Sequence, residues 1–120
     1  MKITLPWPSA KLNPNRSKGM HWASTSALRK VARSDAFALA FKAMSIREFV
    51  RPPATGAVAL SITFVQPDRR ARDRDNLLAA LKPSLDGVAD ALGINDSQFD
   101  PITIRREYGA KPGSVIVEVA

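Results

Sequence analysis

The sequence predicts a single small α+β domain, residues 1–120, with helices packed on a mixed sheet. Two observations lead to this fold class. Large apolar residues alternate with small or polar ones from Ala57 to Val65, which is the two-residue period of a half-buried strand. After Asp75, leucine and valine recur at steps of three and four residues, which is the period of a helix. The order we expect along the chain is β-α-β-α-β-β.

The first elements are a short strand at Lys2–Leu5 and a long helix, separated by a loop rich in Pro, Asn and Ser. Ser24 or Thr25 is the expected N-cap of that helix, which we expect to run to about Glu48. Apolar residues at helical spacing predict its buried stripe: Leu28, Val31, Ala32, Leu39 and Ala43.

The second helix and two further strands follow the strand at Ala57–Val65. We expect this helix to begin near Asp75 and to end at Gly93. Residues Ile102–Tyr108 and Ser114–Glu118 are predicted to pair as a closing hairpin around two glycines. The predicted buried stripe of the helix consists of Leu78, Leu81, Leu85, Val88 and Leu92.

The whole chain has a net charge of +7, but one segment differs in charge from the rest. Seven of the eleven acids lie between Asp68 and Asp100, where five Lys or Arg leave a balance of −2. The remainder has 13 basic and 4 acidic residues, a balance of +9. A basic body favours a polyanionic partner, nucleic acid above all. Clustered carboxylates repel such a partner unless a cation such as Mg²⁺ binds to both.

Several protein classes are excluded or disfavoured. The absence of Cys removes disulfides, thiol nucleophiles and Cys-ligated zinc, and the single His argues against a His-rich zinc site. The N-terminal residues lack the pattern of a signal peptide, and no apolar run is long enough to span a membrane. We therefore expect a cytoplasmic protein without a membrane partner.

Three carboxylates are the candidate catalytic metal ligands. Asp73 and Asp75 are two residues apart, so both side chains point to one side of an extended segment. Asp96 follows the second helix and supplies a third ligand if its loop folds back. The expected cofactor is Mg²⁺, with Mn²⁺ able to substitute. Alternatively, Asp75 only caps the helix while Arg72 and Arg74 neutralise the neighbouring acids.

Lysine 82 is the fourth candidate catalytic residue. Lys82 and Asp86 have the i, i+4 spacing of an ordinary surface ion pair on a helix. The functional alternative places the Lys82 ammonium beside a scissile phosphate, where it stabilises charge in the transition state.

Basic and aromatic residues are the candidates for DNA contact. Trp7, His21 and Trp22 either contact DNA or, for the tryptophans, pack against the core. The basic candidates either grip phosphates or form a solvated charge run: Arg16, Lys18, Arg69, Arg70, Arg72 and Arg74.

Several motifs occur together in one order. They are Leu5–Pro8, Asn13–Trp22, the Arg-rich Asp73–Leu77, Lys82–Gly87 and Asp96–Gln98. In this order and spacing, which cover nearly the whole chain, they resemble the RusA family of Holliday junction endodeoxyribonucleases. These are small basic proteins common in phages and prophages.

The resemblance implies an α+β homodimer that binds four-way DNA junctions and nicks two strands symmetrically, using Mg²⁺, in DNA recombination and repair. Two positions depart from the family pattern. Asn95 stands where the exit loop often carries another acid, and Ala79 stands where some members have the lysine. The family's acidic ligands and essential lysine map onto Asp73, Asp75, Asp96 and Lys82.

We therefore predict a structure-selective endonuclease that resolves Holliday junctions, in which a metal-bound hydroxide attacks the phosphate. The alternative is a non-catalytic basic DNA-binding protein, such as a small phage regulator, whose acids serve as caps and ion pairs. A third possibility is a factor that binds RNA or an acidic protein.

Overall fold

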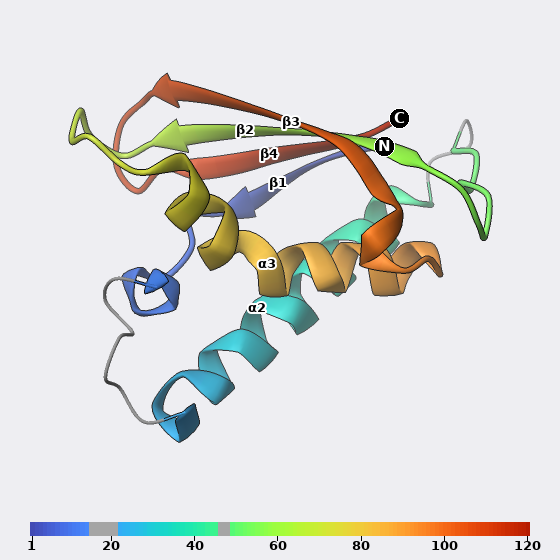
Figure 1. Ribbon diagram of the computed structural model, residues 1–120, viewed down its shortest axis with the longest axis horizontal. Helices are drawn as coiled ribbons and strands as arrows, with labels where there is room; N and C mark the ends of the chain where they lie inside the picture. Colours follow the sequence, from blue (N-terminus) through green and yellow to red (C-terminus); the bar gives the residue numbers. More distant parts are fainter. Residues whose placement is uncertain (15–21, 46–48) are drawn as a thin grey trace.

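The computed structural model describes residues 1–14, 22–45 and 49–120, and shows a four-stranded sheet with two long helices on one face (Figure 1). The α+β class and the mixed sheet are therefore confirmed. No helix in the described part of the chain is long and apolar enough to cross a membrane. The elements in chain order are β1 (Lys2–Pro6), η1 (Ala10–Leu12), α2 (Trp22–Ala43), β2 (Val58–Gln66), α3 (Arg74–Leu92), η2 (Asp96–Gln98), β3 (Phe99–Tyr108) and β4 (Ser114–Val119).

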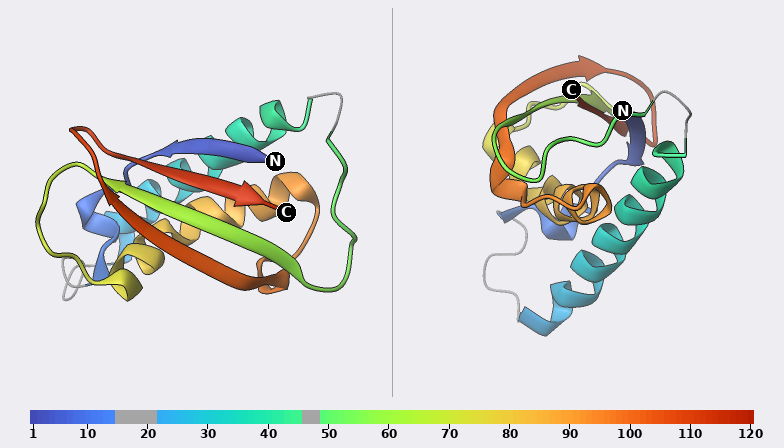
Figure 2. Two further views of the ribbon diagram at one scale, coloured as in Figure 1. Left: turned by 90° about the horizontal axis from the view of Figure 1, so that it is seen from above. Right: turned by 90° about the vertical axis from the view of Figure 1, so that its right-hand side faces the viewer.

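The strand order is β1-β4-β2-β3, so the predicted hairpin of the last two strands is wrong (Figure 2). β3 runs parallel to β2, and β4 lies antiparallel between β1 and β2. The chain after β3 passes around the end of β2, where the Gly109 amide donates to the Gln66 carbonyl at 2.8 Å. A Cβ at Gly109 would lie 2.6 Å from Val65 Cγ1. The two glycines of the connection thus permit a close passage around β2.

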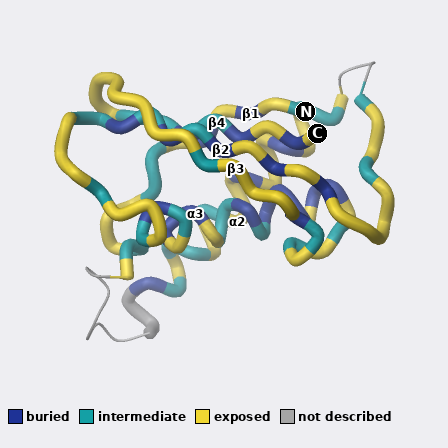
Figure 3. Tube along the Cα trace, turned by 45° about the horizontal axis from the view of Figure 1, so that its top comes forward, coloured by how far each residue is buried: buried dark blue, intermediate teal, exposed yellow. Residues whose placement is uncertain are grey.

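The core lies between the helix-facing side of the sheet and α3. Alternate residues of β2 are buried as predicted, and Gly93 ends α3 in the left-handed conformation, at φ 71°. Of the predicted α3 stripe only Leu78 is not fully buried. β3 forms one edge of the sheet and is exposed along most of its length (Figure 3).

Helix α2 begins earlier than predicted. It starts at Trp22 and ends at Ala43, so neither Ser24 nor Thr25 is its N-cap. Thr25 is instead buried, and its hydroxyl accepts a 2.6 Å hydrogen bond from Arg29 one turn later. Glu48, the expected end of the helix, lies outside the described residues.

The buried face of α2 also differs from the prediction. Ala36 and Ala40 are fully buried, whereas Val31 is 56% exposed and Leu39 is 37% exposed. The cause is the close crossing of α2 over α3, where a Cβ added to Gly87 would lie 2.1 Å from the Arg33 carbonyl oxygen. Small residues therefore fill the crossing. Larger ones turn outward, including the stacked rings of Phe37 and Phe41 on the exposed side of α2, whose centroids are 6.0 Å apart.

Candidate nuclease site

Asp73 is the N-cap of α3, a role that the sequence interpretation gave to Asp75. The Asp73 residue is extended, and its Oδ1 accepts hydrogen bonds from the amides of Asp75 at 2.8 Å and Asn76 at 3.3 Å. Asp75 lies in the first helical turn with its side chain exposed. The correction follows from helix geometry, because the capping carboxylate must precede the amides that it satisfies by two or three residues.

The loop before α3 is held by an internal ion pair. Arg72 donates to both carboxylate oxygens of Asp68, at 2.8 and 3.2 Å, and its guanidinium lies 5.4 Å from the Trp7 ring centroid. The hydrogen bond from Arg72, with help from the Arg70 amide and both arginine charges, lowers the pKa of Asp68 well below its usual range. Trp7 in turn packs edge-on against Phe64, so the core interpretation of Trp7 is confirmed. Arg72 thus fixes the loop to the body of the protein.

The other arginines of this loop point outward. Arg70 has an 80% exposed side chain and lies 3.5 Å from Asp68, Arg74 is exposed, and Arg69 lies over the ring of Tyr108 at 5.2 Å. Sequence reasoning missed the basic residues that β3 and its connection to β4 bring to this region: Arg105, Arg106 and Lys111. Arg106 donates to the Arg72 carbonyl at 3.0 Å, which joins β3 to the loop.

Some predicted contacts lie outside the described residues, namely Arg16, Lys18 and His21, as does the side chain of Trp22.

Lys82 lies between two carboxylates. Its Nζ is 2.9 Å from Asp86 Oδ1, the predicted i, i+4 pair, and it also donates to Asp96 Oδ2. Burial on its own lowers the pKa of Lys82, but the hydrogen bonds and charges of Asp86 and Asp96 outweigh it and raise the pKa. The hydrogen bond from Lys82 likewise lowers the pKa of Asp96. The ammonium therefore stays protonated at neutral pH, with about half of the side chain exposed.

Asn95 helps to place Asp96 at this position. Its Oδ1 accepts from the Ser97 amide at 2.9 Å, while Gln98 Oε1 accepts from the Asn95 amide at 3.0 Å, which completes a capping box. Gln98 Nε2 also donates to the carbonyl oxygens of Pro53 and Gly56. Asn95 therefore has a structural role in the loop that carries Asp96. The N-x-x-Q spacing was the signal for it in the sequence.

The three predicted metal ligands do not form one cluster. No group of three or more His, Cys, Asp or Glu that could hold a metal occurs among residues 1–14, 22–45 and 49–120. Asp73 faces the backbone of its own helix, whereas Asp96 meets Lys82, roughly 10 Å further along the axis of α3 than Asp75. In this arrangement the donor set does not fit a single three-carboxylate metal site.

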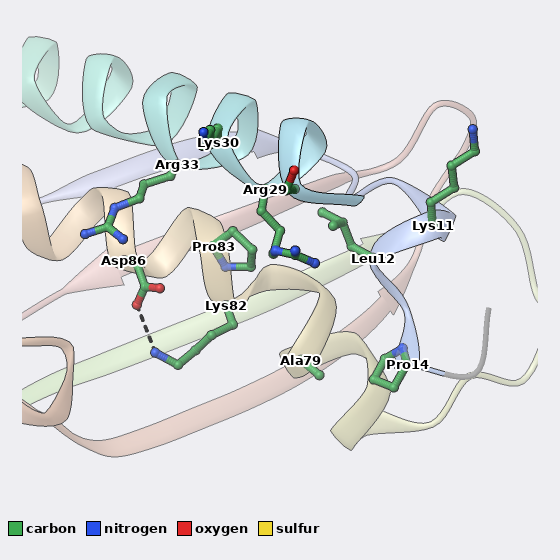
Figure 4. Close-up of a pocket in the computed structure, with 11 residues that line it drawn as sticks. Lys11, Leu12, Pro14, Arg29, Lys30, Arg33, Ala79, Lys82, Pro83 and Asp86 are labelled. Carbon is green, nitrogen blue, oxygen red and sulfur yellow. Dashed lines mark hydrogen bonds and ion pairs between the residues drawn. The ribbon is translucent and has the colours of Figure 1, made fainter. Parts of the chain in front are cut away.

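A cavity of about 550 Å³ opens beside Lys82, between η1, α2 and α3 (Figure 4). Ala79, Lys82 and Asp86 form its α3 wall, since they follow one another at steps of three and four residues on one helical face. Arg29 and Arg33 line it from α2. Ala79 and Lys82 therefore face the same space.

Comparison with known proteins gave one informative relative. No family model matches the chain. An uncharacterized protein of Xylella fastidiosa (strain Temecula1 / ATCC 700964) is 37% identical over 121 aligned positions, which cover 98% of this chain and 74% of the relative. An identity of this size over nearly the whole chain indicates common descent and the same domain.

Proposed function

We propose that this chain, which belongs to the same family as the Xylella fastidiosa protein, is a structure-selective DNA endonuclease. Its substrate is the four-way Holliday junction, which it resolves by paired symmetric nicks in DNA recombination and repair. The resemblance to RusA proteins, which are common in phages and prophages, supports this proposal.

The observation that carries the proposal is the placement of Lys82. A protonated ammonium held by Asp86 and Asp96 stands half exposed on the wall of a cavity whose other charged residues are cationic. Such a group can donate to a phosphate oxygen and stabilise the charge that develops there during cleavage, because it is oriented before the substrate arrives. The two carboxylates set the position of the ammonium and keep it charged.

We propose Mg²⁺ as the cofactor on the resemblance to RusA proteins alone, which implies Asp73, Asp75 and Asp96 as its ligands. The described arrangement does not gather the three carboxylates, so the proposal rests on the protein's own groups around Lys82.

DNA binding is assigned to the outward-facing cations. Arg69, Arg70 and Arg74 lie near the arginines of β3, and together they offer a basic surface at the end of the sheet where α3 begins. Arg72 forms an ion pair with Asp68 and so holds the loop that carries this surface. Because such contacts release counterions from DNA, affinity should fall steeply with salt.

A homodimer completes the proposal. A Holliday junction has approximate two-fold symmetry and requires two incisions, so two copies related by a two-fold axis match it.

The test is cleavage of a labelled synthetic four-way junction with and without Mg²⁺, beside a linear duplex of the same sequence and the Asp75→Asn variant. The expected result is paired, ligatable nicks in the junction alone, which require Mg²⁺ and disappear in the variant while binding persists. Tight junction binding without cutting in Mg²⁺ or Mn²⁺ would overturn the nuclease assignment.

One observation favours the second candidate, a non-catalytic DNA-binding protein. Five acids of the 68–100 segment have structural partners: Asp68 with Arg72, Asp73 with helix amides, Asp90 with Arg33, and Asp86 and Asp96 with Lys82. A pure binder needs no metal, and Asp75→Asn should leave its affinity equal or higher. The same junction assay therefore separates the two candidates.

A further inference from the structure

The cavity beside Lys82 has more positive charge than its own acids neutralise. Its lining includes five cations and one acid, Asp86, which gives a formal balance of +4. Arg33 is bound by Asp90 through two hydrogen bonds of 2.6 and 3.0 Å. Lys11 and Lys30, by contrast, take part in no ion pair within the described residues. Two surplus cations at one cavity favour an anionic occupant.

Apolar side chains line the same cavity. Leu12 from η1, Pro14, and Pro83 and Ala79 from α3 contribute to its wall. Arg29 extends from α2 between Leu12 and Pro83, and Lys11 lies at the outer end with its flexible side chain toward solvent (Figure 4). Inorganic phosphate alone would gain nothing from contact with these apolar side chains. A ligand with a flat apolar part and an anionic part would use both kinds of lining.

From this lining we propose that the cavity binds a single unstacked nucleotide of the DNA strand, with its base against the apolar wall and its phosphate toward Lys11 and Lys30. Its volume of about 550 Å³ lies within the range of about 300–1,000 Å³ that is typical of small-ligand sites. Enzymes that take a base out of the stack hold it between apolar side chains in such pockets. The inference rests on the proposed action on DNA, whose substrate contact it specifies.

The cavity also shares residues with the candidate nuclease site. Lys82 and Asp86 belong to both. A nucleotide within a strand is flanked by two phosphates, so when one lies toward Lys11 and Lys30 the other phosphodiester lies toward the Lys82 ammonium. A base is easiest to extrude where stacking is already interrupted, as at the exchange point of a four-way junction. The cavity therefore links recognition of the junction centre, and any base preference at the cut, to the position of Lys82.

The direct test is an NMR titration of the intact protein with deoxyadenosine 5′-monophosphate, deoxyadenosine and inorganic phosphate in separate arms. Saturable shifts of amides around Leu12 and Ala79 are expected with the nucleotide, at an affinity on the order of tenfold above that for phosphate alone. Ala79→Phe should fill the cavity without removing a charge and abolish these shifts, whereas Ala59→Phe, on an exposed β2 position, should not. Equal affinity for nucleotide and phosphate, or binding that survives Ala79→Phe, would overturn the proposal.

A second measurement separates this inference from the proposed function. The fluorescence of a junction with 2-aminopurine at the exchange point should increase when the wild-type protein binds, because the base leaves the stack. With the Lys11→Gln/Lys30→Gln double variant at saturating protein concentration, this increase in fluorescence should be at least severalfold smaller. An increase in fluorescence without cleavage in Mg²⁺ would support nucleotide binding in the cavity and overturn only the proposed nuclease activity. If the wild type and the double variant cleave at equal rates and the fluorescence does not increase, nucleotide binding in the cavity is overturned, while the proposed nuclease activity stands.

Discussion

The two ends of the candidate site contain similar acids in different surroundings. Where α3 begins, Asp73 caps the helix and Asp68 binds Arg72, so neighbouring charges in the sequence stabilise the local backbone. In the middle of α3, Lys82 meets Asp96, which is 14 positions away in the sequence. Here the tertiary fold brings charges together beside a cavity. The difference teaches that a D-x-D spacing alone does not identify a reactive site, because helix capping uses the same residues.

The largest expected effect comes from Lys82→Ala. If the ammonium stabilises the transition state, junction cleavage should fall by about 10² to 10³-fold while the dissociation constant changes little. Single-turnover cleavage and gel-shift titration at one salt concentration measure the two quantities. Lys42→Ala is the matched control, since Lys42 is an exposed lysine in the last turn of α2.

A compensating variant sharpens this prediction. Ala79 lies one helical turn before Lys82 on the same cavity wall. The double variant Ala79→Lys/Lys82→Ala should therefore recover part of the lost cleavage. If Lys82→Ala cuts at the wild-type rate, the role assigned to Lys82 is contradicted.

The second prediction separates the two roles of Asp73. Asn is as good an N-cap as Asp, so Asp73→Asn should leave the free energy of unfolding nearly unchanged, whereas Asp73→Ala should lower it by about 1 kcal/mol. If Asp73 is also a metal ligand, both variants should lose cleavage on the order of a hundredfold. Urea unfolding and junction cleavage are the measurements. Full activity of a stable Asp73→Asn variant would restrict Asp73 to capping.

These differences also show what the sequence could predict. The strand at Val58–Gln66 and the helix at Arg74–Leu92 follow from local periodicity, and both were predicted nearly to their ends. The hairpin failed because strand pairing depends on distant partners: β4 enters between β1 and β2, whose residues are far apart in sequence. Adjacent strands with glycines between them gave no sign of this insertion.

For the candidate site, too, the sequence predicted contacts within one helix but not contacts between elements. The Lys82–Asp86 pair follows from helical spacing, whereas the contact between Lys82 and Asp96 depends on how η2 folds back. The surplus cations of the cavity come from η1 and α2, and no spacing within one segment brings Lys11 and Lys30 to one cavity. Sequence patterns thus identified the residues of α3 but not the cavity that other elements complete.

The third prediction concerns the crossing that holds α2 against α3. In Gly87→Ala the new Cβ would lie 2.1 Å from the Arg33 carbonyl oxygen, so a helix must shift. We expect a loss of about 1–3 kcal/mol in the free energy of unfolding, despite the better helix propensity of alanine. Thermal and urea unfolding measure it, with Ser84→Ala on the same helix as the control. Unchanged stability would show that the two helices do not approach so closely in solution.

The smallest effect is expected for the pair of Asp68 and Arg72. Because Arg72 lowers the pKa of Asp68 in the folded protein, the stabilisation is fully present above the unfolded pKa of about 4. It should be lost as the pH falls from there through the folded pKa. The free energy of unfolding of the wild type should therefore exceed that of Asp68→Asn at pH 6, and the difference should shrink below pH 4. A difference that stays constant with pH would contradict the ion pair.

The most direct test of the central claim compares junction cleavage by wild type, Asp96→Asn and the exposed control Asp35→Asn, with binding measured in parallel. If the chemistry takes place around Lys82, Asp86 and Asp96, Asp96→Asn should bind the junction but cut it at least about a hundredfold more slowly. Asp35→Asn should cut at the wild-type rate. Equal cutting by Asp96→Asn and wild type, or binding by the wild type without any cutting, would contradict the central claim.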